Sequence, residues 1–377
     1  MFSWSRSSEK LHLARLDMLR GVGALLVLYS HFFDSFALSV NIGGWPWGFS
    51  IISEGKVGVA LFCVISGFIF EFLVRGEQIE YGKFLAARLW RIYPLYVLVL
   101  VFAEFAFKGS ALGLVTQLLA FVPAAEAGDI WSPTWSIVVE FQFYLIFPFL
   151  TILLRQRGHR QLLLIMAFFV TVRLLLWTLG KDVNWIAFSS ICGRMDQFLA
   201  GMMAAKLFYE NKARFLGNPL ALLASLALTF AAVDHFHVIY GSDHPWMDVP
   251  MPQLYAVVWP TVQALCFALV ILSFLQLRIS FPKFMAAPFN YIGKISFSIY
   301  IMHRLVEFAM SKQLNGRIFE ITGHVRTDTL LLCTFVDLPI VLMLASLAYY
   351  AIERPFLGFK KGYLKSKISE EAPVTAS

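Results

Sequence analysis

Two ionisable residues, Arg20 and His31, stand at the two ends of an otherwise apolar stretch within LDMLRGVGALLVLYSHFF. Eleven residues span about three helical turns, so both side chains would point the same way, about 16 Å apart along the axis. An imidazole titrates near neutral pH and can take a proton from a hydroxyl as that hydroxyl attacks a carbonyl. The spacing therefore predicts a general base at His31, with a buried histidine hydrogen-bonded between helices as the alternative.

A pair of arginines, Arg88 and Arg91, lies three positions apart in RLWRIYPLY, which places both on one face of a helix. A guanidinium matches phosphate geometry bidentately, so the pair suits an anionic, phosphorylated ligand. The alternative is that both arginines anchor their helix at lipid headgroups and enforce its orientation.

The segment WSPTWSIVVEFQFYLIFP carries Ser136, Glu140 and Tyr144 at spacings of four residues, which stacks them along one helix face. A carboxylate in such an apolar setting is costly. It could orient a histidine, hold a sugar hydroxyl or accept a proton. A structural hydrogen bond to a neighbouring helix is the alternative.

Two further polar sets interrupt apolar segments. In KISFSIYIMHRLVE, the residues Ser296, Tyr300 and His303 draw a polar line that predicts either a cavity wall or a hydrogen-bonded helix seam. In RMDQFLAGMMAA, Arg194 and Asp196 are two apart and so face different neighbours. They suit either an ion-pair network or the lining of a substrate cavity, and the small residues after them favour close helix packing.

Groups that could bind metal are present, but their spacing is unsuitable. The segment DHFHVIYGSDHPWMD contains Asp234, His235, His237, Asp243, His244 and Asp248, in no closed zinc pattern. A solvated loop that faces carbohydrate is the preferred interpretation, and no metal is expected. The four cysteines lie in apolar runs without metal or redox spacing and are expected to be buried: Cys63, Cys192, Cys266 and Cys333.

The composition is that of a membrane protein, because 59% of the 377 residues are hydrophobic and only 15% are charged. Ten apolar runs are long enough to cross a hydrocarbon core. They cover residues 21–40, 55–74, 92–108, 135–154, 161–179, 187–207, 216–234, 254–277, 288–310 and 329–351. The expected fold is therefore all-α, a polytopic integral membrane protein with about ten transmembrane helices.

The distribution of charge predicts the orientation. Lys and Arg cluster before the first span and after every even-numbered one, so the positive-inside rule places both termini in the cytoplasm. The apolar piece at 111–124 is too short for a comfortable crossing and is expected to be re-entrant or interfacial. The net charge of +7 comes from the inner loops, so no nucleic-acid partner is expected. We expect one membrane domain at 1–356 and a basic, cytoplasmic, disordered tail at 357–377.

Five of these features, taken in order over residues 12–356, resemble the acyltransferase-3 family of membrane O-acyltransferases. Arg20, ten residues and then His31 fit its first-span motif, and Arg88 with Arg91 looks like its arginine motif. The segment WSIVVEFQFYL is similar to the family's Trp-Ser-Leu-x-Val-Glu-Glu-Gln-Phe-Tyr, with Phe141 in place of the second acid. SFSIYIMH and YYAIERPF resemble its Ser-x-x-x-Tyr-x-x-His and Glu-Arg-Pro signatures.

The resemblance implies a bacterial inner-membrane enzyme that moves an acyl group, acetyl by default, from cytoplasmic acyl-CoA to a hydroxyl of a surface polysaccharide or lipid-linked sugar. We hypothesise that Arg20, Arg88 and Arg91 hold the acyl-CoA phosphates, and that Glu140 orients His31 as general base. The acceptor or the cavity wall would be contacted by Ser136, Tyr144, Arg194, Asp196, Ser296, Tyr300 and His303. No tightly bound cofactor is expected, because acetyl-CoA enters as a substrate; the remaining partners are membrane lipids, and the oligomeric state is left open.

Two alternatives do not involve catalysis. A transporter of a small anion or lipid-linked sugar would also place charges inside ten spans, but the chain shows no inverted half-repeat. A catalytically inactive scaffold in a polysaccharide-assembly complex would tolerate alanine at the polar positions. The set of intact motif residues favours the enzyme.

Overall fold

The computed structural model describes residues 6–36, 49–106, 134–181, 183–240, 253–279, 281–314, 319–359 and 362–364. At 6–11, 103–106, 134, 240 and 253 it describes the backbone alone. Across these ranges every regular element is a helix, and one isolated bridge joins Ile79 to Leu364. The segment 111–124, expected to be re-entrant, lies outside the described residues.

The described chain folds into long helices separated by short helical segments. The first half contains α1 (Arg6–Phe36), α2 (Ser50–Ser53), α3 (Val57–Val74), α4 (Tyr81–Ala106), α6 (Thr134–Arg157) and α7 (His159–Thr178). The middle contains α8 (Asn184–Ser189), α9 (Ile191–Tyr209), η3 (Arg214–Leu216), α10 (Pro219–Tyr240) and α11 (Gln253–Gln276). The last part contains α12 (Lys283–Lys294), α13 (Ser296–Leu314), α14 (Val325–Leu332), η4 (Cys333–Asp337), α15 (Leu338–Ala348), η5 (Tyr349–Glu353) and α16 (Arg354–Leu357).

Eight helical stretches of the described ranges are long and apolar enough to span a membrane. They coincide with eight of the ten expected spans: His12–Phe36, Val57–Val74, Tyr81–Phe102, Trp135–Arg157, His159–Thr178, Pro219–Ile239, Leu254–Gln276 and Val325–Leu357. The chain is therefore an all-α, polytopic membrane protein.

The other two expected spans, 187–207 and 288–310, are not single apolar helices. The first contains α9, and the second is divided between α12 and α13, which separate at Ile295. Both α9 and α13 have 19 residues, and each carries three Asp, Glu, Lys or Arg side chains. Such helices depend on burial against protein rather than on apolar composition.

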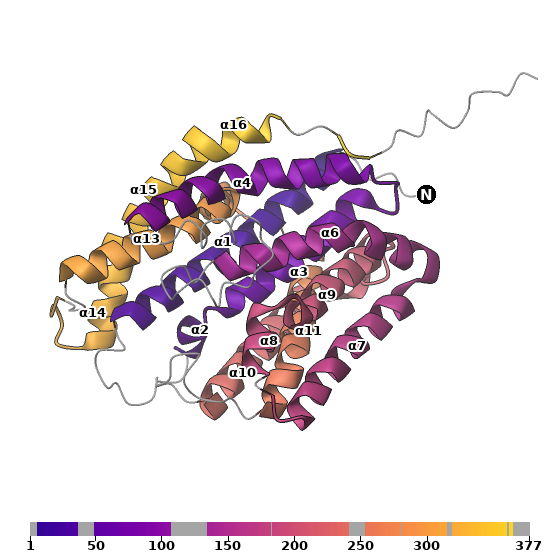
Figure 1. Cartoon of the computed structure of the whole chain (residues 1–377), viewed down its shortest axis with the longest axis horizontal. Coiled ribbons are helices and arrows are strands. Elements are labelled where there is room, and N and C mark those ends of the chain that lie inside the picture. Colours follow the sequence, from indigo (N-terminus) through magenta and orange to yellow (C-terminus); the bar gives the residue numbers. More distant parts are fainter. Residues whose placement is uncertain are drawn as a thin grey trace, which may run out of the picture.

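Helix α3 lies at the centre of the bundle, and all but two of its 18 residues are buried. It packs against α1, α9 and α11, while α12 packs along α1. On one flank of these central helices lie α7 and α10, and on the other lie α4, α13, α15 and α16 (Figure 1). A site between α1, α3 and α13 is therefore enclosed by protein.

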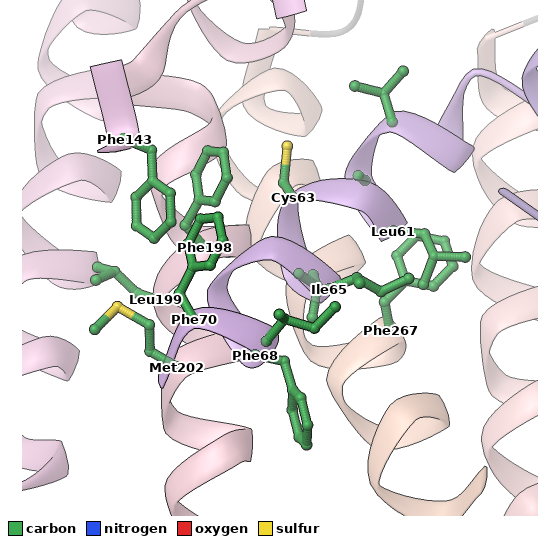
Figure 2. Packing of buried hydrophobic residues seen from close by; sticks show 14 of the residues in the cluster. Leu61, Cys63, Ile65, Phe68, Phe70, Phe143, Phe198, Leu199, Met202 and Phe267 are labelled. Carbon is green, nitrogen blue, oxygen red and sulfur yellow. The ribbon is translucent and has the colours of Figure 1, made fainter. Parts of the chain in front are cut away.

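The contact between α3 and α9 is made through backbone. A Cβ added at Gly67 would collide with the carbonyl of Phe198, and one at Gly201 would collide with that of Val64. Beside this contact the rings of Phe143 and Phe198 stack with centroids 4.0 Å apart (Figure 2). The prediction that small residues on this helix permit close packing is confirmed.

The last membrane helix contains two wide, π-helical turns, η4 and η5. Each ends on an acid that is followed two positions later by proline: Asp337 before Pro339, and Glu353 before Pro355. A proline has no N–H to donate and its ring crowds the carbonyl four residues earlier, so the preceding turn opens. A wide turn is one way to absorb that misfit, and such turns are frequent at functional sites.

Candidate active site

A cavity of about 390 Å³ lies between α1, α3, α4, α6, α12, α13 and η5. About half of its lining is apolar, and thirteen polar or charged side chains line it: Asp17, Arg20, Ser66, Arg88, Arg91, Ser136, Glu140, Tyr144, Lys294, Ser296, Tyr300, Tyr349 and Glu353. The three arginines that the sequence assigns to one ligand thus share one wall.

Arg88 enters the cavity from α4 with an incompletely partnered charge. Its guanidinium carbon lies 4.8 Å from the ring centre of Phe70, 5.4 Å from that of Phe84 and 5.5 Å from that of Tyr363. The side chain is 8% exposed, and its Nε has no hydrogen-bond partner among the described residues. Aromatic faces attract a cation but do not replace its hydrogen bonds.

Tyr363 belongs to the segment that the sequence predicts to be a disordered tail. Residues 362–364 instead lie against the start of α4, where the backbone N–H of Glu80 donates to the Tyr363 carbonyl at 2.8 Å. The bridge between Ile79 and Leu364 continues this contact. The rest of the tail, from residue 365, lies outside the described residues.

The other two arginines face carboxylates. Arg20 Nη1 donates to Asp17 Oδ1 at 3.3 Å. Arg91 lies in the field of three acids, Glu353 first, then Glu140 and Asp17. Glu353 is not among the site residues predicted from the sequence, although it belongs to the Glu-Arg-Pro signature.

Glu140 has partners other than the predicted one. Its Oε1 accepts hydrogen bonds from the hydroxyl of Tyr144 at 2.6 Å and from Ser66 at 3.0 Å. These partners come from its own helix and from α3, and within the described ranges no hydrogen bond joins Glu140 to His31. The expectation that Glu140 orients His31 is corrected, because spacing on one helix does not show what the facing helix supplies.

His31 lies beside a second histidine rather than on the cavity wall. Its ring centroid is 5.3 Å from that of His303, with the planes at 34°. His303 is 1% exposed and its Nε2 has no hydrogen-bond partner among the described residues. The cavity connects to this pair through Tyr300, whose ring lies 5.7 Å from His303 and whose hydroxyl is 2.6 Å from Ser136 Oγ.

The two residues predicted on α9 do not line the cavity. Asp196 is fully buried in an ion pair with Arg173 of α7, at 2.6 Å, and also accepts a hydrogen bond from Thr261 of α11. Arg194 donates to the Phe188 carbonyl at 2.8 Å and to Gln197 at 3.3 Å. Neither residue lines the cavity; Asp196 belongs to an ion pair, one of the two alternatives drawn from the sequence, whereas Arg194 bonds neutral groups.

The acid- and histidine-rich segment serves as a link between helices where it is described. Asp234 accepts a hydrogen bond from Ser50 at 2.7 Å, and His237 Nδ1 lies 3.0 Å from Glu54 Oε1. Its remaining members Asp243, His244 and Asp248 lie outside the described residues. In the described part of the chain, no cluster of three or more His, Cys, Asp or Glu side chains could hold a metal ion.

Comparison with known proteins identifies the family. Residues 13–359 match the family described as an acyltransferase domain. The chain belongs to the acyltransferase-3 family. No solved structure matches the chain.

Two curated relatives extend this result. BcsY of Komagataeibacter xylinus, named as a membrane-bound transacylase, is 24% identical over 315 residues that cover 76% of this chain and 71% of BcsY. MdmB of Streptomyces mycarofaciens, named as an acyltransferase, is 32% identical over 127 residues, 30% of this chain and 32% of MdmB. The protein is thus a multi-pass membrane acyltransferase, and the arginine-lined cavity is its candidate active site.

Proposed function

We propose that this acyltransferase moves an acyl group, acetyl by default, from cytoplasmic acyl-CoA to a hydroxyl of a surface polysaccharide or lipid-linked sugar at a bacterial inner membrane. The observation that carries the proposal is the incompletely partnered guanidinium of Arg88 in a cavity shared with Arg20 and Arg91. A buried cation without its hydrogen bonds is costly, and an anionic ligand removes that cost. The phosphates of CoA are such a ligand.

The acids of the cavity explain why three arginines can share it before a donor arrives. Glu353, Glu140 and Asp17 offset the charge of Arg91, and Asp17 holds Arg20. Arg88 has aromatic rings around its guanidinium, and Glu140, whose field reaches it, also acts on Arg20 and Arg91. In this arrangement Arg88 makes the first strong contact with a donor phosphate, and the other two arginines add to the attraction.

The transfer itself needs a base for the acceptor hydroxyl. In our proposal His31 accepts that proton as the hydroxyl oxygen forms a bond to the thioester carbonyl carbon. The carbon–sulfur bond then breaks, and the CoA thiolate takes up a proton to leave as the thiol. Two charged imidazoles with ring centroids 5.3 Å apart would repel each other. In our proposal His303 therefore stays neutral, and its ring packs beside His31 and holds it in position.

The hydroxyl-bearing residues suit the acceptor side. Ser136 and Tyr300 both line the cavity and bond each other at 2.6 Å, and the ring of Tyr300 lies 5.7 Å from that of His303. Either hydroxyl can exchange this bond for one to a sugar hydroxyl. Glu140, held by Tyr144 and Ser66, would fix the wall beside them.

The experiment measures the release of CoA thiol from acetyl-CoA by the purified protein in detergent. The acceptor is surface polysaccharide prepared from cells that lack this protein. We expect His31→Ala to lower turnover about 10²- to 10⁴-fold, the usual contribution of a general base, while acetyl-CoA still binds. His235→Ala, at an exposed histidine of α10, is the matched control and should keep wild-type turnover. Near-normal turnover by well-folded His31→Ala would refute the assignment of the base.

A further inference from the structure

A second group of buried acids lies away from the cavity, beside the wide turn η4. Asp337 is 0% exposed, and neither of its carboxylate oxygens has a hydrogen-bond partner among the described residues. Glu307 of α13 is 1% exposed; its Oε2 accepts a hydrogen bond from Arg304 at 3.0 Å, and its Oε1 has no described partner. Nothing in the proposed reaction uses either carboxylate.

The groups around this pair come from three sides, and among the described residues Arg304 is the cation hydrogen-bonded to it. Helix α1 contributes Tyr29, which bonds Thr334 at 2.9 Å, and Asp34, whose charge is offset by Lys56 at 2.5 Å. The wide turn itself contributes Cys333, which lies in the field of Asp337 and Glu307. Arg304 of α13 is bound to Glu307 and therefore offsets one of the two central carboxylates.

The charge count requires a further positive species. Two neighbouring carboxylates in a low-dielectric interior cannot both be ionised at small cost when one guanidinium faces them. Glu307 holds that guanidinium, so the uncompensated charge falls on Asp337. The described part of the chain offers no third acidic, histidine or cysteine ligand for a metal ion here, which leaves a proton as the simplest occupant.

The backbone around Asp337 repeats a feature found at a second acid, Glu353. Asp337 and Glu353 both end wide turns and both precede a proline by two positions. Glu353 reaches the cavity and faces Arg91. The same construction thus presents acids into the bundle at two depths, roughly 24 Å apart along the helix.

We propose that Asp337 and Glu307 form a buried proton-binding site that holds one proton, on Asp337, with Glu307 about one turn of α13 beyond His303. Arg304 couples the two, because it bonds Glu307 and also lies in the field of both His31 and His303. With Asp337 neutral, the Arg304–Glu307 pair adds no net charge next to the histidines. This coupling to His31 rests on the function proposed above, whereas the bound proton does not.

The bound proton is measured by infrared spectroscopy of the resting protein in detergent, without substrate. At neutral pH the wild-type spectrum should contain the carbonyl stretch of a protonated carboxylic acid, shifted in deuterated water and absent from both Asp337→Asn and Asp337→Ala. Asp328→Asn is the matched control: Asp328 is also buried, but backbone N–H groups and the Thr322 hydroxyl satisfy it. That variant should keep the band.

Two outcomes would overturn the bound proton. One is a band that persists unchanged in both Asp337 variants, which would assign the proton elsewhere. The other is a wild-type band that appears only when sodium is removed, which would make the occupant a monovalent cation.

The coupling to the histidines has a separate readout. The pH profiles of acyl transfer by the wild type and by Asp337→Asn should agree over the pH range in which the wild-type infrared band is present, and diverge above the pH at which that band disappears. Identical profiles over the whole pH range would show that the bound proton does not affect His31. Because the infrared band needs no turnover, failure of the transfer assay leaves the proton-binding result intact.

Discussion

Arg88 is a buried cation of the cavity whose Nε has no hydrogen-bond partner among the described residues. If this charge binds the donor phosphates, Arg88→Ala removes a charge-assisted hydrogen-bonding group worth about 1.5–3 kcal/mol. We expect the KM for acetyl-CoA to rise about 10- to 100-fold, while kcat at saturation changes less than about threefold. Steady-state kinetics over a wide range of acetyl-CoA concentrations separate the two constants.

The specificity of that result depends on a comparable arginine outside the cavity. Arg160 of α7 is exposed, so Arg160→Ala should leave both constants at the wild-type values. Arg88→Lys keeps the charge but loses the planar fork, so it should give an intermediate KM. A fall in kcat with an unchanged KM would place Arg88 in the chemical step rather than in donor binding.

At the scale of elements, the short segment 362–364 completes the aromatic surround of Arg88. Tyr363 contributes a ring face 5.5 Å from the guanidinium carbon. A cation–π contact at a partly buried site contributes about 0.5–2 kcal/mol, so Tyr363→Ala should raise the KM for acetyl-CoA about 2- to 30-fold. Tyr363→Phe keeps the ring and should match the wild type. Equal KM values for all three proteins would show that the ring does not position Arg88.

At the scale of the whole molecule, the buried ion pair of Arg173 and Asp196 ties the peripheral helix α7 to α9 and, through Thr261, to α11. Removing one partner strands a buried charge, so Asp196→Ala should lower the free energy of unfolding by about 3–5 kcal/mol. Denaturant or thermal unfolding in detergent measures the change. Lys212→Ala, which breaks an exposed pair with Glu210, should cost less than about 1 kcal/mol.

The same variants distinguish a structural role from a catalytic one. Replacing both partners with apolar residues, Arg173→Met with Asp196→Leu, should restore most of the stability lost in Asp196→Ala. Acyl transfer per folded molecule should then equal that of the wild type. A folded double variant without activity would show that Asp196 takes part in substrate binding or catalysis.

Sequence reasoning succeeded where one helix or one ordered motif carries the information. The spacing of Ser136, Glu140 and Tyr144 placed all three on the cavity wall, because residues four apart share a helix face. It failed where the partner comes from another helix. The contact of His31 with His303, and that of Glu140 with Ser66, depend on how α1, α3, α6 and α13 pack, which no single segment encodes.

The elements show the same division. Apolar length identified eight membrane helices, since hydrocarbon thickness sets their length directly. The expected span 187–207 contains α9, whose charged groups are stabilised by neighbouring helices rather than by composition, whereas the break at Ile295 was not predicted. The two wide turns were not predicted either, although the repeated acid-x-proline pattern was a signal that could have found them.

The wide turns also set the angular phase of the last helix. A π-helical turn holds one more residue than an α-turn, so each one rotates everything beyond it by about 100°, the step of a single α-helical residue. The turn at Cys333–Asp337 precedes Glu353 on the same helix, so its extra rotation contributes to the direction in which Glu353 faces Arg91. Deleting one residue there would turn Glu353 towards lipid or another neighbour. The direction in which Glu353 faces therefore depends on the turn that ends at Asp337, because one helix carries both acids.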